Sequence, residues 1–324
     1  MGKYKFVIIG EGKINTMPNA VFKSFKKLGE NATLIALDKG HLNSKNWIIN
    51  RFYLEINKAI DFFKPNNYFL KKISEINPDF VLIFKGDKVN IHSLKERFKN
   101  IKFINWHVDD PFNKNYIDLI GVDSLLKYDM HLSSRKHLFQ EYKTHGLKNL
   151  TYIELAADYE IFNFYSSNKY FITFVGNYSS YRDLVVRKIS KKFKITVWGS
   201  GWHKNYKNKN NNITIHGFSH YKNYIKVSKS SCYTLNILTP ENSDKSNLRI
   251  FEQIAIGANQ LVLGDLNDEI KRQYKIHSFS TIDQLIDFIT FDGKEYNSQN
   301  EIYYENRVNK LLKKINEIWN NSTM

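Results

Sequence analysis

The stretch that decides the fold runs from residue 171 to residue 263. It contains, in order, the segments FITFVGNYSSYRDLVVRKI (171–189), KITVWGSGW (194–202), ITIHGF (213–218), CYTLNIL (232–238) and NLRIFEQIAIGANQLVL (247–263). Each holds a short apolar run of strand length, and the first and last also space their apolar residues as a helix does. Strands that alternate with helices form a parallel sheet that is covered on both faces. We therefore predict a doubly wound α/β domain here.

The first half of the chain repeats this alternation. Strand-like runs occur at KFVIIG (5–10), ATLIALD (32–38), DFVLIFKG (79–86), KFINWHVDD (102–110), DMHLSS (129–134) and LTYIEL (150–155). Helical spacing lies between them, over 17–28 and over 51–76 with a break near Pro65. The sequence thus predicts a second parallel sheet of the same kind.

The domain boundaries follow from a polar linker and a helical tail. The segment ADYEIFNFYSSNKY (157–170) separates the two alternating halves, and apolar residues recur at helical spacing from Tyr304 to Trp319. We predict a Rossmann-like domain over 1–167, a second one over 168–300, and a closing helix within 301–324 that packs back toward the first. Ligands of such sheets bind at the carboxyl ends of the strands, here in a central cleft between the domains.

The charge of the chain favours anionic partners. Its 48 lysines and arginines exceed its 32 aspartates and glutamates, which gives a formal net charge of +16. The lysines are spread along the whole chain, so we expect no specific nucleic-acid partner. No apolar run reaches the roughly 18–20 residues of a membrane-spanning helix, and the single cysteine, Cys232, fits a reducing compartment. We expect a cytoplasmic protein, with peripheral contact to an anionic membrane (the inner face) as an option for the aromatic and basic segment 51–73.

Two helix starts carry the residue types that bind a diphosphate. Gly176 and Asn177 form a turn after a strand, and Arg182 falls in the first turn of the next helix. Ser246 and Asn247 precede the second helix, which we predict over 250–257. Free N–H groups at a helix start and a guanidinium both favour phosphate. The simpler readings are a turn glycine, a surface arginine paired with Asp183, and ordinary N-caps.

Further polar positions follow other strands at the same predicted edge. Gly199, Ser200 and Gly201 form a flexible loop between two tryptophans, where the backbone can approach a nucleotide. His216 and Gly217 end the next strand, where they would contact the base or the ribose. Both loops also fit plain strand-to-loop turns, and these alternatives stay open.

These motifs resemble a known family. VGN-x-x-x-x-R, VWGSGW, the HG step and N-x-R-x-F-E-x-x-A-x-G-A-x-Q-L are similar to the C-terminal half of CgeB-like (spore-maturation-type) glycosyltransferases, and NPDFVLIFKG with INWHVDDPF to their N-terminal half. The resemblance spans roughly residues 77 to 264. It implies the GT-B fold, with a sugar nucleotide bound mainly by the C-terminal domain and the acceptor mainly by the N-terminal one. It also implies a metal-independent reaction, without a cofactor, that uses a donor such as a UDP-sugar in cell-surface polysaccharide synthesis.

The resemblance also implies roles for individual donor-side residues. Arg182 would hold the β-phosphate, Arg249 would belong to the donor site, and Glu252 would bind the ribose hydroxyls; a carboxylate in a first helical turn is favourable for dipole reasons alone. Retaining GT-B enzymes often carry two glutamates with seven residues between them. Here Asp244 stands at the earlier position, with Glu241 nearby, so the spacing holds while the residue differs.

On the acceptor side, three residues follow the strand KFINW. His107 with Asp109 or Asp110 would serve as general base toward an acceptor hydroxyl, or the aspartates would cap a helix beginning at Pro111. The loop with Gly12 and Lys13 has only part of a G-x-G-x-x-G pattern and would line the acceptor side, with Lys13 near the donor phosphates.

The function predicted from the sequence is transfer of a sugar from a nucleoside-diphosphate sugar to a glycan or a lipid-linked glycan. The histidines are scattered, so no metal site is expected. Two alternatives stay open. One is a sugar-nucleotide 2-epimerase of the same fold, which needs no acceptor. The other is a non-catalytic module that binds polyanions through the net positive charge.

Overall fold

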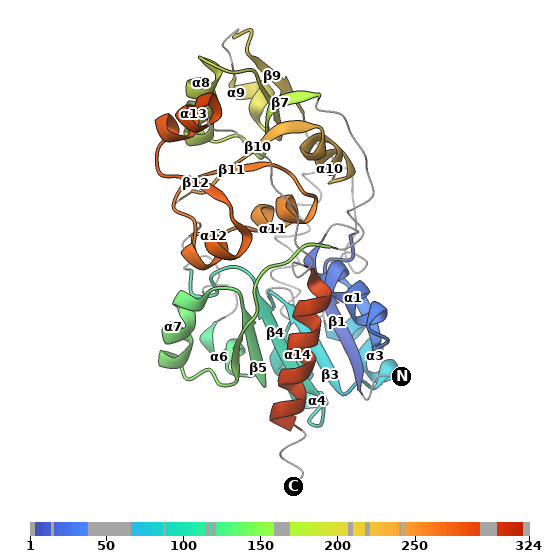
Figure 1. Ribbon diagram of the computed structural model, residues 1–324. Coiled ribbons are helices and arrows are strands. Elements are labelled where there is room, and N and C mark those ends of the chain that lie inside the picture. The colour runs from blue at the N-terminus through green and yellow to red at the C-terminus, as the bar shows by residue number, and fades with distance from the viewer. Residues whose placement is uncertain are drawn as a thin grey trace. The chain divides into compact units, whose positions relative to one another are not determined.

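The chain folds into two compact units, residues 1–154 with 304–324 and residues 155–303 (Figure 1). The computed structural model describes residues 4–13, 16–37, 66–86, 89–113, 117, 121–158, 169–206, 210–217, 221–239, 242, 244–291 and 303–319. Of the proposed membrane-contact segment, residues 51–65 lie outside this described part, as does Glu241.

Unit 1 is a parallel sheet of six strands in the order β2-β1-β3-β4-β5-β6. The strands are β1 (Lys5–Gly10), β2 (Asn31–Ala36), β3 (Phe80–Phe84), β4 (Lys102–His107), β5 (Met130–Ser133) and β6 (Leu150–Tyr152). The helices are α1 (Met17–Lys27), α3 (Asn66–Ile76), α4 (Ile91–Arg97), α6 (Val122–Leu125), α7 (Phe139–Thr144) and α14 (Tyr304–Trp319). Successive strands are added on opposite sides of the β1/β3 pair: β2 lies beside β1, and β4, β5 and β6 follow beyond β3.

The C-terminal helix α14 is part of unit 1 (Figure 1). It packs beside α1, where Lys27 Nζ lies 2.8 Å from Glu305 Oε1. At its far end Trp319 meets the ring of Phe80 edge-on, at 5.3 Å between centroids. The tail of the chain thereby covers one face of the first sheet.

Unit 2 is a parallel sheet of six strands in the order β12-β11-β10-β7-β8-β9. The strands are β7 (Tyr170–Val175), β8 (Ile195–Trp198), β9 (Ile213–His216), β10 (Ser231–Ile237), β11 (Gln260–Leu263) and β12 (His277–Phe279). The helices are α8 (Ser180–Ser190), α9 (Trp202–Asn205), α10 (Tyr221–Lys229), α11 (Leu248–Ala255), α12 (Asp268–Tyr274) and α13 (Ile282–Phe291). Two doubly wound parallel sheets are what the sequence predicted, and this prediction is confirmed.

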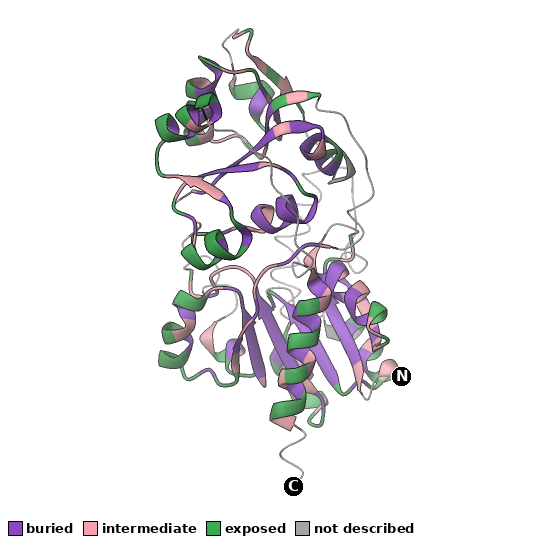
Figure 2. Cartoon of the chain, in the orientation of Figure 1, coloured by how far each residue is buried: buried purple, intermediate pink, exposed green. Residues whose placement is uncertain are grey.

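Burial in both units concentrates on the strands. Figure 2 shows the strands of the sheets largely buried, while the outer faces of the helices are exposed. In β3 every residue from Phe80 to Phe84 is buried. A strand that is buried on both faces reads as a continuous apolar run, which is why these segments were recognisable in the sequence.

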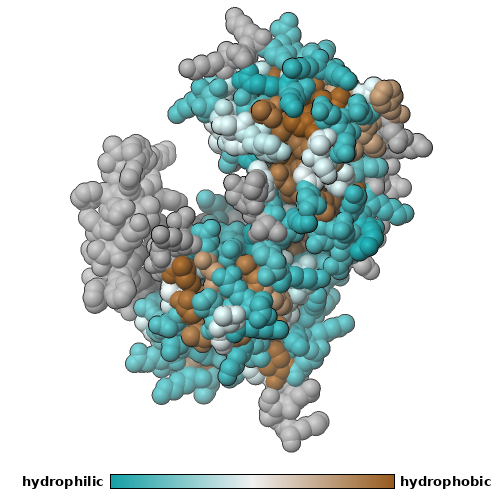
Figure 3. All heavy atoms as spheres, turned by 90° about the vertical axis from the view of Figure 1, so that its left-hand side faces the viewer, coloured by the Kyte–Doolittle hydropathy of each residue, from teal (hydrophilic) through white to brown (hydrophobic). Residues whose placement is uncertain are grey.

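The surface is mainly polar. Hydrophilic residues cover most of the face drawn in Figure 3. Large exposed apolar side chains in the described part are scattered: Tyr68, Leu126, Phe171, Tyr181, Leu184 and Phe291. Among the described helices, none is both long and apolar enough to cross a membrane.

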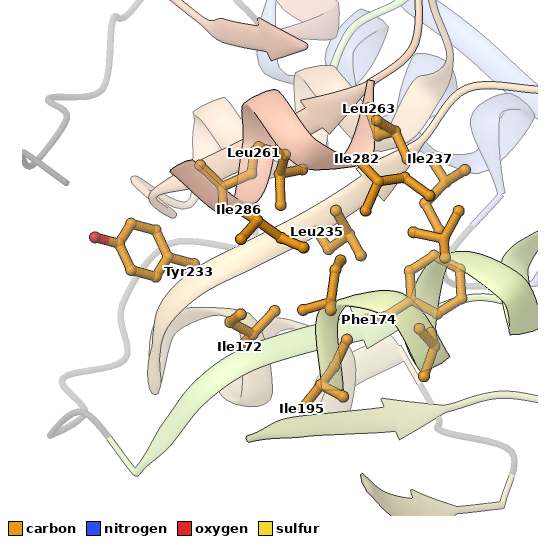
Figure 4. Close-up of a cluster of buried hydrophobic side chains, with 14 of the residues drawn as sticks. Ile172, Phe174, Ile195, Tyr233, Leu235, Ile237, Leu261, Leu263, Ile282 and Ile286 are labelled. Carbon is orange, nitrogen blue, oxygen red and sulfur yellow. The ribbon is translucent and has the colours of Figure 1, made fainter. Parts of the chain in front are cut away.

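The core of unit 2 lies between the sheet and the helices α8 and α13. Figure 4 shows Phe174, Leu235 and Leu263, from three neighbouring strands, pointing toward Ile282 and Ile286 of α13. On the other face α11 and α12 pack over Val262. The apolar core therefore fixes the strand ends, and with them the loops that follow.

Candidate active site

The strand order of unit 2 creates a switch point between β7 and β10. These strands are neighbours, with Leu235 opposite Phe174. The strands that follow β7 in the chain, β8 and β9, extend the sheet on one side of this pair, and those that follow β10, β11 and β12, extend it on the other. Ligands of doubly wound sheets bind at such a point, beyond the carboxyl ends of the strands. Here the two ends are followed by the loop with Gly176 and by the polar segment before α11.

Two loops at this edge are locked together. Gly176 N–H donates to Trp198 O at 2.9 Å, and its carbonyl accepts from Trp202 Nε1 at 2.8 Å. Gly199 has φ +155°, and a Cβ placed on it would lie 2.0 Å from Gly176 O. Gly176 and Gly199 thus join the ends of β7 and β8, and the N–H group of Gly176 is used within the protein.

The side chain of Arg182 folds back over the loop that contains Gly176 and Asn177. Ser179 caps α8 by accepting from Arg182 N at 3.3 Å, and Arg182 Nη1 donates to Asn177 O at 2.9 Å. The guanidinium carbon lies 5.9 Å from the centre of the Phe174 ring. A positive charge is thereby held at the carboxyl end of β7. Asp183 pairs with Arg187 instead, at 2.8 Å.

The start of α11 is held by two asparagines. Asn247 caps the helix by accepting from Ile250 N at 3.1 Å. Its Oδ1 also accepts from Asn236 Nδ2 at 3.1 Å, and its Nδ2 donates to Asn236 Oδ1 at 3.0 Å. Asn236, near the end of β10, is a residue that our sequence analysis missed; a polar residue in the apolar run CYTLNIL was the available signal.

Glu252 lies deeper than the sequence suggested. The helix begins at Leu248, two residues before the predicted start, because Asn247 caps it. Glu252 therefore lies in the second turn of α11. The prediction that it lies in the first turn was wrong. Its side chain is only 9 % exposed, and its Oε2 lies 3.3 Å from Arg249 Nη1. Arg249 in turn stacks on Tyr224 of α10, a residue with no sequence signal of its own.

The loop between β10 and α11 is held by hydrogen bonds between its own residues. Asn242 Oδ1 accepts from Thr239 N at 3.0 Å, and Ser246 Oγ donates to Asp244 Oδ2 at 3.0 Å. Lys245 Nζ pairs with Asp265, beyond the neighbouring strand β11. Asp244 therefore lies in the loop that leads to the α11 start, on a different element from Glu252.

The remaining donor-side candidates end β8 and β9. Gly201 has φ +85° and precedes α9. The exposed His216 ring stacks on Trp198, with centroids 4.6 Å apart and planes inclined by 12°. Ser200 accepts from Tyr178 N at 2.9 Å, and Gly217 accepts from Gly199 N at 3.2 Å.

Unit 1 gathers the acceptor-side candidates at the ends of neighbouring strands. His107 is fully buried, with Nδ1 3.1 Å from Asp109 O. The Asp109 side chain is half exposed and pairs with Lys85 Nζ at 2.7 Å; Lys85 directly follows β3 and was not a candidate before. Asp110 accepts from Phe112 N at 2.9 Å, which makes a turn.

The loop after β1 carries Gly12 and Lys13. It is held from within: Thr16 Oγ1 donates to Glu11 O and Lys13 O, at 2.6 and 2.9 Å, and Asn19 Nδ2 donates to Gly12 O at 3.2 Å. Within the residues that the structure describes, no group of three or more His, Cys, Asp or Glu is arranged to hold a metal ion.

Solved structures with this architecture decide the fold. A glycosyltransferase from Rickettsia africae ESF-5 is similar over 98 % of this chain and 99 % of its own, with a TM-score of 0.61 and 17 % identity. The fold is GT-B. Anabaena HepE, solved in complex with UDP-glucose, is similar over 89 % of each chain, with a TM-score of 0.61 and 9 % identity. The UDP-GlcNAc 2-epimerase from Methanocaldococcus jannaschii covers 95 % of this chain and 99 % of its own, with a TM-score of 0.54 and 12 % identity.

Sequence comparison adds one match. Residues 182–308 of this GT-B chain match the family model described as Glycosyl transferase-like. No curated protein is similar to the chain. The matched range begins at Arg182 and includes the α11 start with Asn247 and Glu252.

Proposed function

We propose that this GT-B protein is a CgeB-like glycosyltransferase that moves a sugar from a nucleoside-diphosphate sugar to a hydroxyl group of a glycan or glycolipid. The observation that carries the proposal is the match of residues 182–308 to a glycosyltransferase-like family, since this range includes Arg182 after β7, the strand β10 and the start of α11. The presence of UDP-glucose in HepE, a structure of the same fold, supports a UDP-sugar as donor.

In the proposed reaction, unit 2 binds the donor. The acceptor oxygen attacks the anomeric carbon, the bond from that carbon to the diphosphate oxygen breaks, and the nucleoside diphosphate leaves with the bonding electrons. Arg182 and the N-terminal N–H groups of α11 stabilise the charge on the leaving diphosphate. Glu252 accepts hydrogen bonds from the ribose hydroxyls. Because these groups supply the positive charge, we propose that the reaction needs no metal ion.

Unit 1 would supply the base in this proposal. His107 is buried, whereas Asp109 is reached by solvent and is held by Lys85. We assign proton removal from the acceptor hydroxyl to Asp109, with His107 supporting the backbone of the turn. The loop with Gly12 and Lys13 follows β1, which is separated from β4 by β3 in the same sheet, and is proposed to line the acceptor side.

The test starts with nucleotide binding. The protein is melted with UDP, GDP, dTDP, CMP and their sugars, and the sugar nucleotide that stabilises it is then incubated with candidate glycan acceptors, with and without EDTA. Stabilisation of several kelvin by one nucleotide, and acceptor-dependent release of that nucleotide unaffected by EDTA, would support the proposal. Absence of both binding and turnover in a cooperatively melting protein would contradict it and favour the polyanion-binding alternative.

A 2-epimerase is the second candidate. The similarity to the UDP-GlcNAc 2-epimerase over nearly the whole chain favours it specifically. An epimerase converts the donor without an acceptor and leaves the sugar–diphosphate bond intact in its product. Chromatography of UDP-GlcNAc incubated with the protein, without and with a glycan acceptor, separates the two candidates. Formation of the epimer without acceptor supports the epimerase, and release of UDP only with acceptor supports the transferase.

A further inference from the structure

Glu252 is held by a contact on its own helix. It lies one turn after Arg249 on α11, and Arg249 Nη1 is 3.3 Å from Glu252 Oε2. The glutamate side chain is 9 % exposed, so its carboxylate has lost most of its water. A carboxylate in such a position stays ionised only when a positive charge or hydrogen-bond donors compensate for the lost hydration. Arg249 supplies this compensation.

Arg249 is held in turn by a residue of another helix. Its guanidinium carbon lies 3.9 Å from the centre of the Tyr224 ring, which is a close cation–π contact. Tyr224 belongs to α10 and is 2 % exposed. Its ring packs in a cluster with Ile225, Ile256 and Ala258, so it has little freedom to move. Burial raises the pKa of the Tyr224 phenol, which therefore stays neutral and keeps its electron-rich face.

Tyr224 packs in the core cluster and contacts Arg249, and Arg249 contacts Glu252 at the candidate donor site. A guanidinium is planar, so stacking on a ring fixes the plane in which its N–H groups point. With that plane fixed, the N–H group facing Glu252 restricts the rotation of the carboxylate. The orientation of Glu252 is thus determined by Tyr224, a residue too deeply buried in α10 to touch a ligand.

We propose that Tyr224 and Arg249 are positioning residues that hold Glu252 in the orientation in which it accepts hydrogen bonds from a ribose, and that they thereby set a preference for ribonucleotides over 2′-deoxyribonucleotides. This inference rests on the proposed function, in which Glu252 contacts the donor ribose. It gives Arg249 an indirect role, in place of the direct donor contact that the sequence suggested.

Direct binding of the diphosphate by Arg249 and positioning of Glu252 by Arg249 predict different relative affinities for UDP and 2′-deoxy-UDP. An arginine that binds the diphosphate directly would contribute equally to UDP and to 2′-deoxy-UDP, because the two share that group. An arginine that positions Glu252 contributes to the difference between them. The ratio of the two dissociation constants therefore measures the positioning role, and a general loss of stability does not change it.

The experiment measures binding of UDP, 2′-deoxy-UDP, GDP and 2′-deoxy-GDP by calorimetry to the full chain and its variants. A hydrogen bond to a charged group corresponds to roughly a ten- to hundredfold change in affinity, which is the ribose preference expected of the wild type. Glu252→Gln is expected to reduce this preference to about threefold or less. Tyr224→Leu removes the ring and is expected to approach the value of Glu252→Gln. Tyr224→Phe keeps the ring face and is expected to retain the wild-type preference.

Arg249→Lys provides a second variant in case Tyr224→Leu does not fold. It keeps the charge but loses the planar group, so an intermediate preference is expected. A wild-type preference in both folded Tyr224→Leu and Arg249→Lys would overturn the inference, as would an unchanged preference in Glu252→Gln. Failure of the wild type to bind any of these four nucleotides, or dTDP or CMP, would instead contradict the proposed function itself.

Discussion

Asn236 and Asn247 exchange two amide hydrogen bonds, of 3.1 and 3.0 Å, between the end of β10 and the start of α11. Asn247 at the same time caps α11 through Ile250 N. The pair ties the helix start to the strand end at the switch point of unit 2. The proposed diphosphate site therefore depends on a contact between side chains that lie on two different elements.

Replacement of Asn236 by alanine is expected to destabilise unit 2. The substitution removes both hydrogen bonds between the two partly buried amides, and each such bond contributes about 0.5–1.5 kcal/mol. Urea denaturation followed by circular dichroism measures this loss. Asn205→Ala, which removes an exposed amide at the end of α9, serves as the control and is expected to lose less. Equal losses in the two variants would argue against a special role of the pair.

Gly199→Ala is expected to be strongly destabilising. The new Cβ would lie 2.0 Å from Gly176 O at a backbone φ of +155°, so the joined loops must separate. We expect a loss of about 3 kcal/mol or more in the free energy of unfolding. Gly217→Ala is the matched control, because its Cβ would have no neighbour closer than 3.9 Å. A Gly199→Ala protein as stable as Gly217→Ala would show that the loops are not packed as described.

Arg182→Ala is expected to reduce turnover while leaving the protein folded. The side chain is partly buried and donates to Asn177 O, while the cap of α8 uses the backbone N–H of Arg182, so the helix start is expected to survive its loss. Loss of a preorganised positive group at a developing charge typically slows a reaction about 10²- to 10³-fold. Steady-state rates with the sugar nucleotide identified by melting test this, with Lys188→Ala on the same helix as control. Unchanged turnover would remove the phosphate role of Arg182.

The stability of unit 1 is expected to fall between pH 6.5 and pH 4. Burial lowers the pKa of His131 from 6.5 to about 4, with a smaller contribution from His107. In this range the unfolded chain takes up a proton at His131 and the folded chain does not, so stability decreases as the pH falls. The shift corresponds to about 3 kcal/mol.

The measurement compares urea midpoints of the wild type and His131→Gln at pH 7 and pH 4.5. The variant lacks the titrating imidazole, so its loss of stability over this range should be smaller by about 2–3 kcal/mol. An identical pH dependence in both proteins would show that His131 does not cause the decrease.

The sequence sufficed for the fold because the signals are local. The buried strand from Phe80 to Phe84 and the helix from Tyr304 to Trp319 are visible as an apolar run and as helical spacing. Candidate residues could also be assigned to strand ends, since a polar or glycine residue directly follows each apolar run. These features need only neighbouring residues in the chain.

The contacts within the site could not be predicted in this way, because they join segments that are distant in sequence. The Tyr224–Arg249 stack depends on how α10 packs beside α11, and the Lys85–Asp109 pair depends on β3 lying next to β4. The burial of His107 likewise follows from the packing on the sheet rather than from its neighbours in the chain. The start of α11 was misplaced because the capping by Asn247 outweighs the apolar spacing that begins at Ile250.

The most direct test of the account is calorimetric binding of UDP to the wild type and to Asn247→Asp. Aspartate caps a helix as well as asparagine does and can still accept from Asn236 Nδ2, but it loses the bond to Asn236 Oδ1 and places a negative charge where the diphosphate is proposed to bind. Thr281→Asp, which adds a carboxylate before α13 beyond the edge strand β12, is the matched control. We predict that Asn247→Asp binds UDP at least about tenfold more weakly while Thr281→Asp binds it as the wild type does. Equal affinity of all three proteins would contradict a diphosphate site at the start of α11.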